Sequence, residues 1–225
     1  GNLPYQDKRV RQAIAMAVDN ATCLELGYSN KGAVADNHHA GSMHPEHDPS
    51  VGRLPHDPAR ALELMKEAGM EDYEHELISI DDDWRKNTTD AVAAQLRDAG
   101  IKVKRTILPG STFWNDWAKY PFSSTNWNHR PFATQVWGLA YRSGEAWNEF
   151  GWSNAEFDAL LAEANSIADA DARREVAGKI QTIVVEEGVT IQPYWRSLYR
   201  SHAPNAVCDM HIAYHAHVYK WGLKA

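Results

Sequence analysis

The segment NWNHRPFATQVW at 126–137 combines several side chains that can bind a small molecule. Trp127 offers a flat face for stacking, and Asn128 and His129 offer hydrogen-bond donors and acceptors. Arg130 presents a guanidinium fork that fits a carboxylate or a phosphate. In the alternative, structural interpretation, Trp127 fills the core and Arg130 is a solvated loop charge. We favour a ligand-binding wall, because rings, amides and a proline together are poor material for a core.

Acidic residues crowd a second candidate position, SIDDDWRK at 79–86, directly after a predicted strand. Three carboxylates there would favour a cationic or polyhydroxylated ligand, and the neighbouring indole could stack on it. Alternatively, one of the carboxylates caps the following helix. The candidate residues are Asp81, Asp82, Asp83 and Trp84.

A third candidate is AYRSGEAWNEFGW at 140–152, where Tyr141, Arg142 and Trp147 surround a Ser-Gly turn. This segment fits a ligand cleft and an ordinary surface loop equally well. The sequence leaves both open.

Metal and catalytic motifs are weak. His38, His39, His44 and His47 lie within ten residues, but in an irregular loop without the i, i+4 spacing or the cysteine pair of a metal site. We therefore interpret them as structural and predict no metal and no cofactor.

The chain has no Gly-x-Ser-x-Gly, phosphate-loop or His-Glu-x-x-His motif, so we predict a protein without enzymatic activity. The open alternative is a glycosidase that uses Asp82 with a second carboxylate about 5–10 Å away.

The composition restricts the classes of partner. The net charge is −7, and the lysines and arginines are scattered, which argues against nucleic acid and anionic membranes. Nine Trp and nine Tyr stand against five Phe, so most large rings have a polar edge suited to half-wet surfaces.

No apolar run approaches the roughly 18 residues of a membrane span, and no signal peptide is recognisable, so we expect either a cytosolic protein or one whose start has been removed. Cys23 and Cys208 could form a bridge or remain thiols.

The hydrophobic patterns predict an α/β fold. A strand, a helix and a strand follow one another in the middle of the chain, as in the crossover unit of a sheet. Segment 32–56 is rich in Gly, Pro, Asn and His and is expected to be irregular but ordered. Predicted helices begin near Asp7, Asn20, Asp57, Thr88, the capping box at 153–156 and Asp169, and predicted strands cover 75–80, 101–108 and 188–195.

Four segments, in this order, resemble one family. They are DKRVRQAIAMAVDNATCLELGYSNKGA (7–33), HDPARALELMKEAG (56–69), TTDAVAAQLRDAGIKVKR (88–105) and the run from WSNAEFDALLAEANS to VVEEGVTIQPYW (152–195). Together they resemble the C-terminal half of the periplasmic oligopeptide-binding proteins, the solute receptors of ABC importers for peptides, nickel complexes, opines and some oligosaccharides.

The resemblance implies a two-lobed receptor of which this chain is a fragment. Residues 1–194 would form the C-terminal lobe, with a mixed sheet flanked by helices. Residues 195–225 would cross back to the absent N-terminal lobe, and His202, His211, His215 and His217 would face it. The protein would be periplasmic, its signal peptide lying outside this fragment, and its partners would be an ABC permease and a solute held between the lobes.

The sequence thus predicts the substrate-binding component of an ABC importer, with a peptide, an opine-like conjugate or an oligosaccharide as solute. Besides the glycosidase, a stand-alone Trp-rich interaction module remains open. That module would have its C-terminal tail folded onto its own domain.

Overall fold

The computed structural model describes residues 4–209 and 216–224, so His211 and His215 lie outside the described residues. Two short helices open the chain. Asp7 accepts a hydrogen bond from the Arg9 amide and begins α1 (Lys8–Met16), as predicted. α2 (Asn20–Tyr28) is capped by Asp19, which accepts from the Thr22 amide, one residue before the predicted cap. None of the helices in the described ranges is long and apolar enough to span a membrane.

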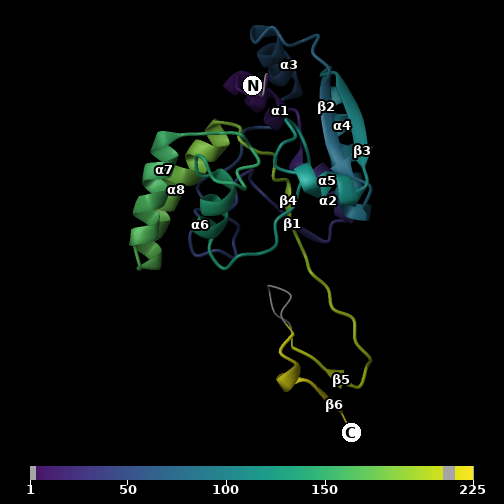
Figure 1. Cartoon of the computed structure of the whole chain (residues 1–225), viewed down its shortest axis with the longest axis vertical. Coiled ribbons are helices and arrows are strands. Elements are labelled where there is room, and N and C mark those ends of the chain that lie inside the picture. Colours follow the sequence, from purple (N-terminus) through teal and green to yellow (C-terminus); the bar gives the residue numbers. More distant parts are fainter. Residues whose placement is uncertain (1–3, 210–215, 225) are drawn as a thin grey trace.

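The predicted crossover unit is confirmed. β2 (His75–Ile80) and β3 (Val103–Leu108) pair in parallel, and α4 (Asp83–Asp98) joins them (Figure 1). α4 begins five residues before the predicted Thr88, because Asp82 takes the N-cap position and the first turn is too polar to show a helical apolar pattern. α5 (Gly110–Asp116) follows β3.

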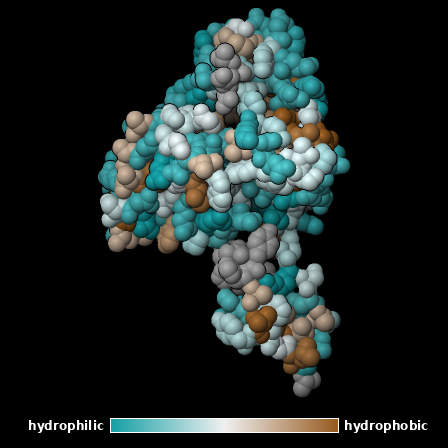
Figure 2. Space-filling view, viewed as in Figure 1, coloured by the Kyte–Doolittle hydropathy of each residue, from teal (hydrophilic) through white to brown (hydrophobic). Residues whose placement is uncertain are grey.

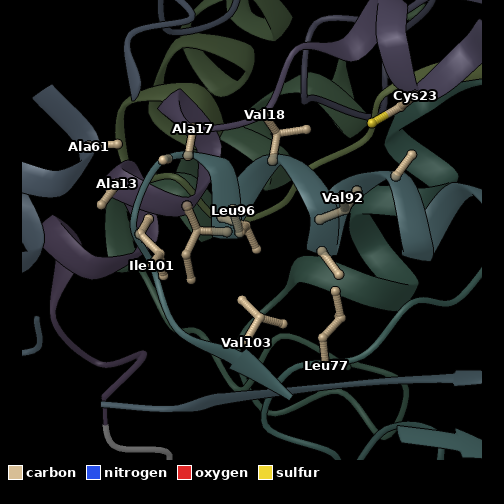
Figure 3. Packing of buried hydrophobic residues seen from close by; sticks show 14 of the residues in the cluster. Ala13, Ala17, Val18, Cys23, Ala61, Leu77, Val92, Leu96, Ile101 and Val103 are labelled. Atoms are coloured by element: carbon tan, nitrogen blue, oxygen red, sulfur yellow. The ribbon is translucent and has the colours of Figure 1, made fainter. Parts of the chain in front are cut away.

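The first hydrophobic core lies between this unit and the N-terminal helices. Leu77 and Val103 point from the strands toward Val92 and Leu96 of α4 (Figure 3). On the other side, α1 and α3 (Pro58–Glu67) pack closely through small residues such as Ala13 and Ala61. Each fully buried Leu or Val side chain contributes about 1.5–3 kcal/mol, so this cluster is a main source of stability.

A second hydrophobic core surrounds α7 (Ala155–Ser166) and α8 (Ala170–Glu186), which lie side by side in Figure 1. Asp169 caps α8 as predicted, but Asn154, not Ser153, caps α7 by accepting from the Phe157 amide. α6 (Ala133–Val136) runs directly into a π-helical turn, η1 (Trp137–Tyr141), which buries Trp137 and Tyr141 completely.

The irregular segment predicted over 32–56 is irregular and ordered over 35–56, but the prediction is wrong for 32–34, which form a short strand. Its anchor is Glu46, which is fully buried, pairs with Arg173 of α8 at 2.8 Å and accepts from the Ala133 amide at 3.1 Å. The Gln181 amide group also donates to the Glu46 carbonyl at 2.9 Å. These bonds tie the loop to the second core.

After α8 the chain forms one strand of a short two-stranded ladder. It then leaves the body of the molecule, the part that holds both cores. β1 (Gly32–Val34) pairs antiparallel with β4 (Tyr194–Arg196). The strand predicted over 188–195 is therefore wrong for 188–193, where the described backbone forms no ladder. The α/β class is confirmed, and the described strands form three two-stranded pieces, one parallel and two antiparallel.

Beyond β4 the chain extends away from the body, and its last elements lie apart from it (Figure 1). These are β5 (Ala206–Val207), η2 (Val218–Lys220) and β6 (Gly222–Leu223), with β5 and β6 paired. Apolar surface gathers on this part (Figure 2), where Val218 and Leu223 are exposed. Cys208 in the tail and the buried Cys23 are both free thiols.

Candidate ligand-binding site

A cavity of about 650 Å³ lies between the two cores. One side is lined from the first core by Ile14, Leu77 and Val92, and the other from the second core by Val136 and Val189. The rest of the wall comes from two further segments, the irregular 120–130 and 188–196, of which the second ends in β4. Trp84 and Arg85 of α4 and His39, Met43 and His44 of segment 35–56 complete it. The volume suits a small organic solute.

Neighbouring side chains of segment 125–127 have different hydrogen-bond partners. Thr125 and Trp127 both donate to the carboxylate of Glu149, the latter from Nε1 at 2.7 Å. Asn126, between them, accepts from Nε of Arg85 at 2.7 Å. The predicted wall is thus fixed from both sides, and Trp127, Asn128, His129 and Arg130 all line the cavity.

Trp127 also belongs to a cluster of three indoles. Its ring lies 6.1 Å from Trp117 and 6.0 Å from Trp147, both edge to face. Trp147 is 49% exposed and does not line the cavity, so it supports the wall from outside.

Histidines of segment 35–56 contact the wall at its other end, residues 129–130, and the neighbouring core. His44 donates from Nε2 to the Arg130 carbonyl at 3.0 Å and accepts at Nδ1 from the Gly41 amide, and these partners assign its neutral tautomer. Its ring stacks on His129 at 5.5 Å. His39 bonds the Tyr141 hydroxyl at 2.6 Å, and burial lowers the pKa of His39 to about 3. No group of three or more potential ligands able to hold a metal occurs in the described ranges.

Glu149 is the only carboxylate that lines the cavity among the described residues. Its two oxygens accept from Thr125 and Trp127, which are neutral donors. Burial raises the pKa of Glu149, and the two hydrogen bonds oppose this shift.

The acidic trio after β2 does not line the cavity. Asp82 is at the N-cap of α4, makes no capping bond through its side chain, and pairs with Arg85. Trp84 does line the cavity, and the guanidinium groups of Arg85 and Arg196 each lie 4.6 Å from its ring centroid. The local charge facing the cavity is therefore basic, whereas Asp81, Asp82 and Asp83 had suggested the opposite sign.

Tyr141 and Arg142, from the third candidate segment, also lie outside the cavity lining. Tyr141 is fully buried in the second core, and Arg142 pairs with Glu145 near the surface. Both residues therefore make structural contacts outside the cavity.

Several cavity residues were not predicted as site residues: Glu149, Arg85 and Arg196 were not singled out, and His44 was interpreted as structural. Glu149 is one of thirty acids, and nothing in its local pattern marks it. Its special environment comes from Thr125 and Trp127, more than twenty positions away in sequence.

Comparisons with known proteins agree on one family. The model of the bacterial extracellular solute-binding proteins, family 5 Middle, matches residues 1–149. Di/tripeptide-binding protein 3 of Pseudomonas aeruginosa is 26% identical over 228 residues, which cover 93% of this chain and 41% of that protein. The dipeptide-binding protein DppE of Bacillus subtilis is 23% identical, covering 85% of this chain and 38% of its own length. The chain thus spans about two fifths of the length of these relatives.

Solved structures have the same fold. The oligopeptide-binding protein AppA from Bacillus subtilis, in complex with a nonapeptide, aligns with a TM-score of 0.82 at 20% identity, over 98% of this chain and 48% of that one. The murein tripeptide-binding protein MppA of Escherichia coli aligns with a TM-score of 0.74 at 19% identity, over 83% of this chain and 38% of that one.

Proposed function

Because this chain belongs to the bacterial extracellular solute-binding proteins of family 5, we propose that it is part of a receptor that captures a small solute outside the cytoplasm and delivers it to an ABC permease. The observation that carries this proposal is the cavity between the two cores, with Trp127 and Arg130 in its wall. The receptor would work in the periplasm, where receptors of this kind meet their solutes.

Residues 1–194 would be one lobe of this receptor, and 195–225 would cross to a second lobe. The tail lies apart from the body and carries exposed apolar side chains, which supports a partner surface supplied by the same protein (Figures 1 and 2). A stand-alone interaction module with its tail folded onto its own domain fits this arrangement poorly. Ligand would close the two lobes only as far as it binds the closed state more tightly.

A peptide is the favoured solute, because the relatives named above are di- and tripeptide-binding proteins. Opine-like conjugates and oligosaccharides are the other candidates. Trp127, Asn128, His129, Arg130 and Trp84 would contact the ligand. The protein would act by binding alone: a glycosidase needs two opposed acids, and the described residues place one carboxylate, Glu149, in the cavity.

The test is to purify the complete protein and identify the co-purifying solute by mass spectrometry. Calorimetric titrations with peptides, opines and oligosaccharides would then give the affinities. We expect Trp127→Ala to weaken binding by about tenfold or more, because it removes a large aromatic contact.

Trp114→Ala is the matched control, since Trp114 is 40% exposed on α5 and does not line the cavity. Equal affinities for Trp127→Ala and Trp114→Ala would remove the wall at 127–130 from the proposed site.

A further inference from the structure

The loop that carries Glu149 is fixed to the second core on both sides of this residue. Directly before it, Asn148 donates from Nδ2 to the carbonyls of Tyr141 and Trp152, at 3.2 and 2.8 Å. Directly after it, the ring of Phe150 packs on that of Tyr141 with 4.4 Å between their centroids. Tyr141 and Trp152 are buried in the second core, so the backbone at Glu149 is anchored there.

The carboxylate of Glu149 in turn holds segment 125–127. Trp127 donates from Nε1 to Oε1 at 2.7 Å, and the hydroxyl of Thr125 donates to Oε2. Each oxygen therefore has a donor from the cavity wall, and both donors are neutral groups. Residues 125–127 belong to no helix or strand, so side-chain bonds of this kind replace a backbone ladder in fixing the segment.

The bond to Glu149 sets the orientation of the Trp127 indole, which lines the cavity. The indole also contacts the rings of Trp117 and Trp147, edge to face. Ring contacts depend weakly on direction, whereas an N–H···O bond weakens steeply when its angle falls below about 120°. A stacking surface that is already oriented loses less entropy when a solute binds than one that is free to turn.

We propose that Glu149 is a positioning residue, which orients the Trp127 indole and segment 125–127 through its two hydrogen bonds and acts as an acceptor, not as a charge that contacts the solute. This inference rests on the proposed function and adds a residue on which affinity depends indirectly. A neutral side chain of the same shape, with an oxygen for Trp127, should therefore serve as well as the carboxylate.

The experiment measures the affinity of the complete protein for trialanine by calorimetry. Glu149→Ala removes both acceptors and should weaken binding by about tenfold, since the indole is no longer oriented. Glu149→Gln keeps an oxygen for Trp127 and can donate to Thr125, so its affinity should stay within about twofold of that of the unmodified protein. Equal losses in the two variants would overturn the inference, because binding would then require the charge.

Glu145→Ala is the matched control. Glu145 lies in the same loop, but its carboxylate pairs with Arg142 and does not line the cavity. This variant should bind trialanine as the unmodified protein does. A loss as large as that of Glu149→Ala would show that the loop sets the affinity without the bonds to segment 125–127, against the inference. A melting curve for each variant verifies that it is folded.

A double-mutant cycle tests whether Glu149 acts through Trp127. Trp127→Phe keeps an aromatic ring in the wall but has no N–H to donate. In this background Glu149→Ala should weaken trialanine binding by about threefold or less, because the bond between the two side chains is already absent. An undiminished effect would mean that Glu149 acts on the solute independently of Trp127, and the inference would be wrong.

The two proposals fail separately. Maltotriose replaces trialanine in all variants if the unmodified protein binds only the sugar. An outcome against the inference, obtained while the unmodified protein binds either probe, leaves the receptor function standing. If the unmodified protein binds no member of the peptide, opine and oligosaccharide panel, the receptor function is wrong, and the inference with it.

Discussion

Burial changes the titration of several side chains in the direction that disfavours their charged form. It raises the pKa of Glu149 and lowers the pKa values of His39 and His75, to about 3 and about 4. These shifts have opposite consequences. The raised pKa favours the neutral form of Glu149, and the lowered pKa values keep His39 and His75 neutral at pH 7.

His75 makes the stability of the protein depend on pH. Its pKa in the folded state lies below the unfolded value of 6.5, so its contribution is complete above pH 6.5 and is lost as the pH falls toward 4. Between pH 6.5 and 5 this one residue should lower the free energy of unfolding by about 1.5 kcal/mol. Urea unfolding of His75→Gln at both pH values should show a loss smaller by that amount.

His56→Gln serves as the control for the same substitution at an exposed position. An unaltered slope in His75→Gln would mean that the pKa of His75 is the same in the folded and the unfolded state.

Individual site residues were predictable where their chemistry was concentrated locally. Trp127 and Arg130 stand out in sequence because rings, amides and a guanidinium adjoin each other. Glu149 could not be found, because its burial and its donors depend on contacts across the fold. The sign of the charge beside Trp84 was mistaken for a related reason: Arg85 and Arg196 contact its ring, while Asp82 is ion-paired.

Helix starts were predictable when one side chain dominates the first turn. Asp7, Asp57 and Asp169 each accept from a backbone amide at the predicted place. Where two candidate caps adjoin, as at 19–20 and 153–154, the choice shifted by one residue. Segment 188–193 is apolar enough for a strand, but it instead forms irregular cavity wall.

Gly188 is the pivot from α8 into that wall, and its backbone has φ of 61°. A Cβ there would lie 2.8 Å from the Gln12 amide nitrogen and 2.9 Å from the Arg11 carbonyl carbon. Gly188→Ala should therefore lower the free energy of unfolding by about 3 kcal/mol or more, since backbone atoms of α1 would have to move. Chemical denaturation measures this change.

Gly69→Ala measures the cost of placing alanine at a positive φ without any steric clash. Gly69 has a similar φ of 68°, but a Cβ there meets nothing within 4 Å. It should cost about 1 kcal/mol. Equal losses at the two positions would show that α1 accommodates the extra methyl group.

The body of the molecule holds both cores, and the tail beyond β4 lies apart from them (Figure 1). Deleting residues 201–225 should therefore leave a folded protein whose melting temperature changes by less than about 3 °C. Circular dichroism during heating tests this. Loss of a cooperative transition would show that the tail is needed by the core.

The α/β class was predictable because apolar periodicity is a local property of the sequence. The cavity was not, because its walls come from segments as distant as Ile14 and Trp195. Contacts of this kind are set by tertiary packing.

The cavity follows the seam between two separately packed hydrophobic bodies. Each body is close-packed and compresses little, so we expect the two to slide against each other more easily than either deforms. A solute wedged along the seam adheres to both faces and opposes that sliding. Binding of a solute in this cavity would therefore stiffen the chain against shear between the two cores.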